Sequence, residues 1–181
     1  MKYARLHKGA ALAGLPGPHQ VGSERGTDKA DVFIGTNFKD RFDGAQGSDY
    51  ISGGNGSDVL EGGSGKDTLI GGNGDDILRG GTGDDTFVFL TAAEASAGGT
   101  LIDRITDFQS GSDKIDLSAF MAGGSFIGTG PLVAGGGKQV AYNVAKSTLV
   151  GDVNGDGVAD FQIYLNTTPT APLVVAGDFL F

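Results

Sequence analysis

A nine-residue repeat constrains the fold of this chain more than any other feature of its sequence. Seven units follow one another from Gly26 to Val88 without an insertion, and they read GTDKADVFI, GTNFKDRFD, GAQGSDYIS, GGNGSDVLE, GGSGKDTLI, GGNGDDILR and GGTGDDTFV. The sixth position is aspartate and the eighth is a large apolar residue in all seven units. A flexible glycine-rich linker has no apolar column that keeps its phase, so the sequence predicts an ordered repeat structure.

The glycines of the repeat predict tight turns. Glycine makes up 34 of 181 residues, well above the roughly 7% of average proteins. It adopts positive φ at little cost, and it leaves the backbone carbonyl oxygens accessible. The x-apolar-x triplet that ends each unit predicts a three-residue strand whose central side chain points inward. Two units, or eighteen residues, then make one coil, and successive coils stack their strands in parallel.

The aspartate column predicts a metal site between stacked turns. Each aspartate lies close to the one two units later, and such carboxylates repel one another unless a cation lies between them. Calcium binds six to eight oxygen atoms and accepts carboxylates and carbonyls together, whereas magnesium demands strict octahedral geometry. Zinc prefers His and Cys ligands, but the sequence has no cysteine and its histidines are His7 and His19. The predicted calcium ligands are Asp31, Asp40, Asp49, Asp58, Asp67, Asp76 and Asp85, with the backbone carbonyls of Gly44, Gly53, Asn55, Gly62, Ser64, Gly71, Asn73, Gly80 and Thr82.

The repeat units differ in how well they fit this site. The four units from Gly53 to Val88 have glycine at the first, second and fourth positions, and the unit at 44–52 lacks only the second glycine. The units at 26–34 and 35–43 lack the fourth-position glycine, so their sites are expected to be the weakest. Stacking every second unit allows five sites between turns, and we expect about three to five calcium ions in the roll.

The charge of the chain argues for cations as partners. The net charge is −9, and residues 26–88 carry eleven Asp and one Glu against five Lys and Arg. Such a surface disfavours nucleic acid. No apolar run approaches the ~20 residues of a membrane span. The basic N-terminus, residues 1–25, has a short apolar stretch broken by glycine and predicts a flexible leader or a cap for the first repeat. The chain is expected to be a monomer.

The period stops after Phe89, and residues 90–181 predict a β-rich, antiparallel cap that covers one open end of the solenoid. Asp103, Asp107, Asp113 and Asp116 are expected to be turn and surface residues. A further calcium loop is predicted from the D-x-N-x-D-G-x-x-D spacing of Asp152, Asn154, Asp156 and Asp160. The twelfth position is Ile163 rather than Glu, so the loop is not an EF-hand. The alternative is a hairpin turn without metal, which Asx residues also favour.

The residues also resemble known families. The pattern G-G-x-G-x-D-x-U-x, with U a large apolar residue, resembles the repeat of RTX calcium-binding proteins, which implies an all-β, right-handed parallel β-roll with calcium in its turns. Residues 103–118 and 151–165 resemble the C-terminal domain of serralysin-type secreted metalloproteases. The final GDFLF, residues 177–181, is similar to the export signal of type I secretion substrates. The resemblance implies a secreted, extracellular protein with the type I secretion machinery as partner.

No catalytic motif accompanies these features. The sequence has no H-E-x-x-H and no G-x-S-x-G, and GGSGKDT has Asp67 where a phosphate loop needs Ser or Thr. We therefore predict that the chain is not an enzyme in itself. The leading hypothesis is a module that folds on binding calcium and serves secretion. One alternative is a module that binds acidic polysaccharide or a cell surface, like the RTX modules of alginate epimerases. The other is the C-terminal fragment of a secreted metalloprotease or lipase.

Overall fold

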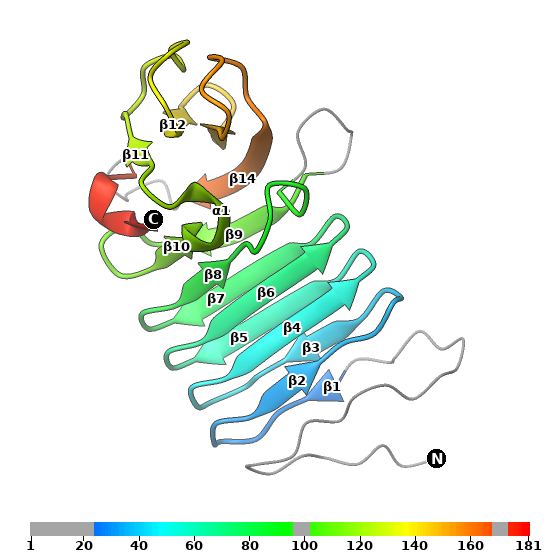
Figure 1. Cartoon of the computed structure of the whole chain (residues 1–181). Helices are drawn as coiled ribbons and strands as arrows, with labels where there is room; N and C mark the ends of the chain where they lie inside the picture. Colours follow the sequence, from blue (N-terminus) through cyan, green and yellow to red (C-terminus); the bar gives the residue numbers. More distant parts are fainter. Residues whose placement is uncertain (1–23, 96–101, 168–173) are drawn as a thin grey trace.

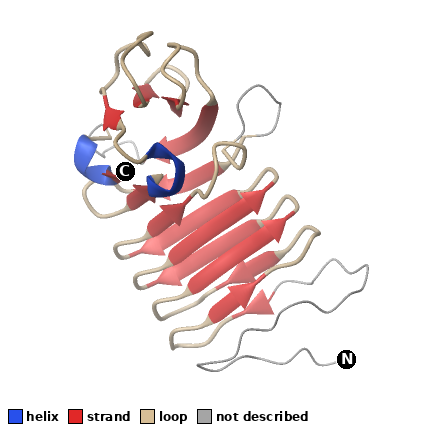
Figure 2. Ribbon diagram, in the orientation of Figure 1, coloured by secondary structure: helices blue, strands red, loops and turns tan. Residues whose placement is uncertain are grey.

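The computed structural model describes residues 24–95, 102–167 and 174–181 of the chain. The predicted leader at 1–25 therefore lies almost wholly outside the described residues. The described chain is nearly all β (Figure 2), and its strands stack as a parallel solenoid (Figure 1), so the predicted fold class is confirmed. No described helix has the length and apolar character that crossing a membrane requires.

The first sheet runs the length of the molecule and joins the roll to the cap. Its nine strands lie in the order β1-β3-β5-β7-β9-β14-β13-β12-β11. Their bounds are β1 Glu24–Arg25, β3 Arg41–Asp43, β5 Val59–Ser64, β7 Ile77–Thr82, β9 Arg104–Phe108, β14 Phe161–Thr167, β13 Thr148–Asp152, β12 Gln139–Asn143 and β11 Ser125–Phe126.

The second sheet has six strands in the order β15-β10-β8-β6-β4-β2. Their bounds are β15 Phe179–Leu180, β10 Lys114–Asp116, β8 Thr86–Val88, β6 Thr68–Asn73, β4 Tyr50–Asn55 and β2 Val32–Ile34. A short helix, α1 (Ser118–Met121), and one 3-10 turn, η1 (Ala176–Asp178), interrupt the β structure.

The register of the sheets follows the repeat. Phe42 pairs with Leu60, and Leu60 pairs with Leu78, each eighteen residues later in the chain. Two units therefore make one coil, as the sequence predicts. The strands of the complete repeats are longer than the predicted three residues, because pairing continues through the glycines: Gly54 pairs with Gly72 in the second sheet. β4 to β7 accordingly have six residues each.

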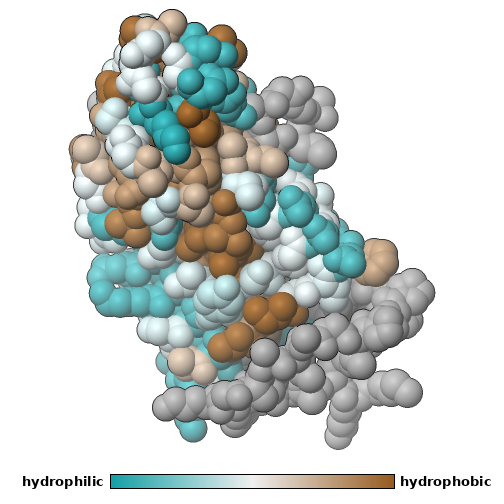
Figure 3. Space-filling view, viewed as in Figure 1, coloured by the Kyte–Doolittle hydropathy of each residue, from teal (hydrophilic) through white to brown (hydrophobic). Residues whose placement is uncertain are grey.

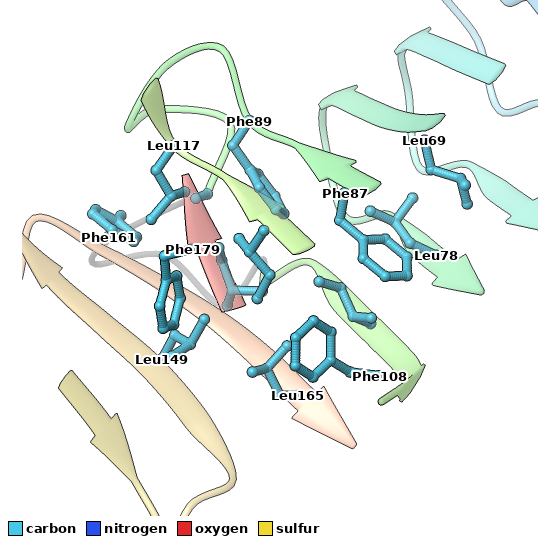
Figure 4. Packing of buried hydrophobic residues seen from close by; sticks show 14 of the residues in the cluster. Leu69, Leu78, Phe87, Phe89, Phe108, Leu117, Leu149, Phe161, Leu165 and Phe179 are labelled. Carbon is cyan, nitrogen blue, oxygen red and sulfur yellow. The ribbon is translucent and has the colours of Figure 1, made fainter. Parts of the chain in front are cut away.

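The apolar column forms the core of the roll. From Phe42 to Phe87, every eighth-position side chain is at most 3% exposed. Phe33 in the first unit is only partly buried and packs on Phe42, with ring centroids 4.9 Å apart. Figure 4 shows how the column passes through Leu78 and Phe87 into the core of the cap.

The sheets continue past the last repeat. β9 pairs in parallel with β7, and β10 pairs in parallel with β8, so that Ile105 and Ile115 extend the apolar column. β13 pairs antiparallel with both β12 and β14, and β14 pairs in parallel with β9. The cap therefore belongs to the same sheet as the roll. On the face seen in Figure 3, apolar residues gather where the cap meets the roll.

The predicted export segment, residues 177–181, lies at the edge of the second sheet. Phe179 pairs with Ile115 of β10, and its ring stacks between those of Phe126 and Phe181, with centroids 4.9 and 5.6 Å away. In the folded chain this segment comprises the end of η1 and the strand β15, with the aromatic ring of Phe179 packed.

Candidate metal sites in the turns

The repeat aspartates form two columns at the starts of the strands. All seven are at most 7% exposed. Each precedes a strand directly, so the odd-numbered units place theirs on the second sheet and the even-numbered units place theirs on the first. We call these ladder 1 (Asp31, Asp49, Asp67 and Asp85) and ladder 2 (Asp40, Asp58 and Asp76).

After the first aspartate of each ladder, one carboxylate oxygen of every aspartate binds the preceding coil. Oδ1 of Asp49 accepts the backbone N–H of Asp31 at 2.7 Å, and Oδ1 of Asp76 accepts that of Asp58 at 2.7 Å. The same bond joins the remaining neighbours at 2.7–2.9 Å. These bonds fix the position and orientation of five carboxylates, those of Asp49, Asp58, Asp67, Asp76 and Asp85.

In the last five units the other carboxylate oxygen has no hydrogen-bond partner among the described residues. This oxygen is the buried Oδ2 of Asp49, Asp58, Asp67, Asp76 and Asp85. A buried carboxylate oxygen without a partner is costly, and buried polar atoms in folded proteins are nearly always satisfied by protein, water or an ion. These atoms therefore fit a cation site.

The first two units satisfy this oxygen differently. Thr27 donates its backbone N–H and its hydroxyl to Asp31 Oδ2 at 2.6 and 2.8 Å. Thr36 makes the same two bonds to Asp40 Oδ2 at 2.7 and 3.0 Å. These units have Thr where the complete repeats have their second glycine. The threonine thus gives a reason, in addition to the missing fourth-position glycine, why the first two units fit a cation less well.

Backbone carbonyls of the following coil meet these free oxygens. Asp49 Oδ2 and the carbonyl oxygen of Gly62 both lie against the Cα of Gly44, where a Cβ would overlap with them. Gly62 is in turn covered by Asp67 Oδ2 and the carbonyl oxygen of Gly80. The equivalent atoms over Gly53 are Asp58 Oδ2 and the carbonyl oxygen of Gly71. Glycine at the first position leaves room for oxygen atoms from two coils.

The carbonyls at the third position of each unit are less available to a cation than those at the first position. Those of Ser64, Asn73 and Thr82 already accept the N–H of Gly47, Gly56 and Gly65 at 2.8–2.9 Å. A carbonyl oxygen has a second lone pair, so a contact to a cation stays possible at these positions. The predicted set thus divides into first-position carbonyls that face the carboxylates and third-position carbonyls that join neighbouring turns.

The mixture of ligands is informative about the ion. Within the described ranges, no three His, Cys, Asp or Glu side chains converge as a metal cluster. A site between turns instead offers carboxylate oxygens together with main-chain oxygens. That is the coordination chemistry of calcium, whereas zinc requires nitrogen or sulfur ligands.

The electrostatics of the ladders favour a bound cation. Burial raises the pKa of Asp58 to about 7 and those of Asp49, Asp76 and Asp85 to about 6, and neighbouring carboxylates add to each of these rises. Backbone N–H donors offset the rises only in part. At neutral pH without an ion, the folded roll therefore holds its carboxylates in an unfavourable environment.

Two further aspartates extend the ladders, and the expectation that they are surface residues is wrong. Asp103 and Asp113 are 0% and 2% exposed. Asp103 Oδ1 accepts the N–H of Asp76 at 2.8 Å, and Asp113 Oδ1 accepts that of Asp85 at 3.1 Å. The sequence carries a signal for both, because each begins an Asp-x-Ile triplet like those of the repeats. Their spacing of 27 and 28 residues hides them from a search at eighteen.

The other two aspartates of this region, Asp107 and Asp116, accept backbone N–H groups. Asp107 accepts the N–H groups of Gly80 and Gly81 at 3.0 and 2.9 Å. Asp116 accepts the N–H of Ser118 at 2.9 Å.

The acidic loop of the cap is satisfied by its own backbone. Asp152 is fully buried, and its two oxygens accept N–H groups of Asn154, Gly155 and Gly157 at 2.6–3.1 Å. Asp160 accepts the N–H of Val153 at 2.7 Å. Asn154 and Asp156 accept the N–H groups two residues later, both at 2.8 Å. These bonds are those of an Asx-stabilised hairpin turn, and the extra calcium site stays a prediction.

Comparison with known proteins identifies the family of the chain. The family model for the C-terminal domain of serralysin peptidases (Peptidase M10) matches residues 44–175, and that for the RTX calcium-binding nonapeptide repeat matches residues 25–60. The chain belongs to the serralysin C-terminal family. RTX repeats bind calcium, and both modules are non-catalytic and typical of secreted bacterial proteins.

One curated protein and two solved structures are similar to parts of this chain. Metallopeptidase AprA of Pseudomonas marginalis is 40% identical over 80 residues, which are 42% of this chain and 16% of that protein. The AlgE6R2 subunit of the Azotobacter vinelandii mannuronan C5-epimerase is 32% identical, with a TM-score of 0.51 over 90% of this chain and 91% of that one. The AlgE6R3 subunit of the same enzyme is 30% identical, with a TM-score of 0.30 over 94% and 86% of the two chains.

Proposed function

We propose that this serralysin C-terminal domain is a calcium-dependent folding module that serves export to the extracellular medium. The observation that carries the proposal is the row of buried Oδ2 atoms in the last five units, which accept no hydrogen bond from any described residue. Calcium that binds only the folded chain adds its binding free energy to folding. Without calcium, the same carboxylates repel one another and oppose folding.

We infer the ligands of three sites from the oxygen atoms that lie together over Gly44, Gly53 and Gly62. Asp49 and the Gly62 carbonyl would hold one ion, Asp58 and the Gly71 carbonyl a second, and Asp67 and the Gly80 carbonyl a third. The aspartate of the following coil adds to each set. Asp76 and Asp85 also have free Oδ2 atoms, and two more ions there would give five.

Export would use the unfolded state. A chain without calcium can thread a narrow channel, and calcium outside the cell would then fold it. In the folded chain the carboxylate of Asp178 accepts bonds from the Ser110 hydroxyl at 2.6 Å and the Gly111 N–H at 2.9 Å. The secretion machinery would therefore recognise residues 177–181 before β15 forms.

The test is a calcium titration of the EDTA-treated protein, followed by far-UV circular dichroism, with magnesium as the control ion. We expect a cooperative gain of β signal in calcium near or below millimolar concentration, and none in magnesium at the same concentration. Protease resistance should rise in parallel. A protein that is already folded in EDTA would overturn the proposal.

A second candidate is binding of an acidic polysaccharide. Two observations favour it: the likeness to a subunit of an enzyme named for mannuronan, and a polar crevice of about 460 Å³ beside ladder 1. Lys66 and Lys114 line the crevice, where Lys66 pairs with Asp84 and Lys114 donates to the Gly177 carbonyl at 2.7 Å. Retention on immobilised alginate at constant calcium, lost when both lysines become alanine, would support this candidate. No retention of the unmodified protein would exclude alginate as its ligand.

The chain also fits the C-terminal module of a larger secreted enzyme. The 80 residues that match the metallopeptidase span 16% of its length. Reading the gene upstream of the first codon tests this directly, because a metalloprotease or lipase domain in frame would supply the activity that this module carries outside the cell.

A further inference from the structure

Asparagine is followed by glycine at three places in the chain: Asn55–Gly56, Asn73–Gly74 and Asn154–Gly155. Such a pair can lose its side-chain amide, because glycine has no side chain to keep its peptide nitrogen away from the asparagine side chain. The glycine nitrogen must give up its proton and approach the side-chain carbon of the asparagine. An N–H that donates to a fixed acceptor is hindered in both steps. The hydrogen bonds of these three N–H groups therefore decide which pair can react in the folded chain.

Two of the three glycine N–H groups are held by acceptors. Gly56 donates to the backbone carbonyl of Asn73 at 2.8 Å. Gly155 donates to Asp152 Oδ1 at 2.6 Å. The peptide nitrogen is thus fixed in both pairs.

Gly74 lacks such an acceptor. In the coil below, the Gly56 N–H donates upward to the third-position carbonyl of the next coil, which is that of Asn73. The repeat ends before it can supply the equivalent carbonyl for Gly74, and β6 pairs with β8 only at its first two residues. Among the described residues, the Gly74 N–H has no hydrogen-bond partner.

Asn55 and Asn73 are otherwise closely matched. Both lie in the sequence G-G-N-G-x-D and both are exposed. The glycines that follow them have φ of +130° and +142°. The Asn55 amide donates to Asn37 Oδ1 at 2.6 Å and accepts the Asn73 Nδ2 at 2.7 Å, whereas within the described ranges the Asn73 amide has only the second of these bonds. The two sites therefore differ in the coil that lies above them.

We propose that Asn73 is a site of spontaneous deamidation in the folded roll, while Asn55 and Asn154 are protected. The Gly74 nitrogen loses its proton to a base in solution and bonds to Cγ of Asn73. The C–N bond of the amide then breaks, and ammonia leaves with a proton returned from solvent. Water opens the resulting cyclic imide at either carbonyl and gives aspartate or isoaspartate. Both products add a negative charge to the turn before Asp76 and remove the donor to Asn55. This chemistry needs no calcium and stands apart from the proposed function.

The test incubates the full chain with calcium at mildly alkaline pH and measures the conversion of amide to acid by mass spectrometry. The tryptic peptides 42–66, 67–79 and 147–181 separate Asn55, Asn73 and Asn154. We expect Asn73 to react at least ~5-fold faster than Asn55, because a backbone hydrogen bond protects only the latter. Asn154 should react as slowly as Asn55. Asn73→Gln is the control variant, since it keeps an amide but closes the cyclic imide far more slowly, and its peptide 67–79 should stay unmodified.

The unfolded chain provides the reference rate. In urea with EDTA, Asn55 and Asn73 should react at similar rates, since their neighbours in sequence are alike. Equal rates at the two sites in calcium would overturn the proposal, and so would an unreacted Asn73 in calcium over a period in which it reacts in urea.

A further incubation in EDTA without urea separates this site from the function of the domain. If the roll unfolds without calcium, the difference between Asn55 and Asn73 should disappear in EDTA. If the difference persists there, the roll is folded without calcium, so the proposed function fails while the deamidation site stands.

Discussion

The repeat roll and the cap bury carboxylates in two different ways. Asp58 in the roll and Asp152 in the cap are 1% and 0% exposed. Among the described residues, Asp152 accepts three backbone N–H groups with its two oxygens, whereas Asp58 accepts one with Oδ1 and none with Oδ2. The cap satisfies its buried charge with its own main chain. In the last five units of the roll, the Oδ2 atom of each repeat aspartate is left for a cation to bind. The stability of the roll should therefore depend on an ion.

The largest expected effect comes from closing the space between the coils. Gly62→Ala places a Cβ against Asp67 Oδ2 and the Gly80 carbonyl. We expect the free energy of unfolding in calcium to fall by about 4 kcal/mol, because both the ion site and the stacking are disturbed. Urea denaturation in calcium measures this. Gly130→Ala is the control, since the nearest atom to its Cβ would be the Ile127 carbonyl oxygen at 4.0 Å, an ordinary contact distance, and equal loss in the two variants would contradict the explanation.

Removing one carboxylate charge should have different effects on stability in the roll and in the cap. Asp58→Asn keeps the Oδ1 acceptor but weakens an ion site, so the variant should need more calcium to fold. In EDTA the same variant should be more stable than the unmodified protein, because one repulsive charge is gone. Asp152→Asn should show no such opposite effects, since its carboxylate faces backbone donors only. Urea midpoints with and without calcium test both variants, and a shift of the same sign in both conditions for Asp58→Asn would count against the ion.

The metal-free roll should lose stability as the pH rises. The folded-state pKa is about 6 for Asp49, Asp76 and Asp85 and about 7 for Asp58, above the ordinary value of about 3.9 expected in the unfolded chain. Between these pKa values the folded state therefore binds more protons than the unfolded chain does. The free energy of unfolding consequently decreases from about pH 4 toward pH 8. The affinity of the folded roll for calcium should instead rise with pH, because calcium and protons compete for the same carboxylates. Urea midpoints of metal-free protein at pH 5 and pH 8 measure the first effect, and a higher midpoint at pH 8 would contradict it.

The smallest effect is expected in the first coils. Thr36→Val removes the hydroxyl that donates to Asp40 Oδ2 at 3.0 Å. We expect a loss of about 1 kcal/mol in unfolding free energy, with no change in the number of calcium ions. A calcium count that falls by one would show that this turn holds an ion despite its threonine.

The regular part of the fold could be predicted because one period encodes it. Asp at the sixth position and an apolar residue at the eighth determined the parallel stacking, the eighteen-residue coil and the core from Phe42 to Phe87. The strand length could not be predicted from the triplet alone, since pairing through the glycines depends on the neighbouring coil. Asp103 and Asp113 were missed because the insertions before them change the spacing but keep the Asp-x-Ile triplet. The role of Thr27 and Thr36 became visible only when the free oxygen of the other units was known.

The eighteen-residue coil also limits how such a gene can change in length. Each strand of the roll pairs with the strand two units away, and the cap joins the roll through β9 on β7 and β10 on β8. Gain or loss of two units leaves every residue on its own sheet and leaves the cap in place. Gain or loss of one unit would move every later strand of the roll to the other sheet. β9 and β10 of the cap would then each lie beside the wrong strand of the roll. Duplication during evolution should therefore add repeats to this domain in pairs.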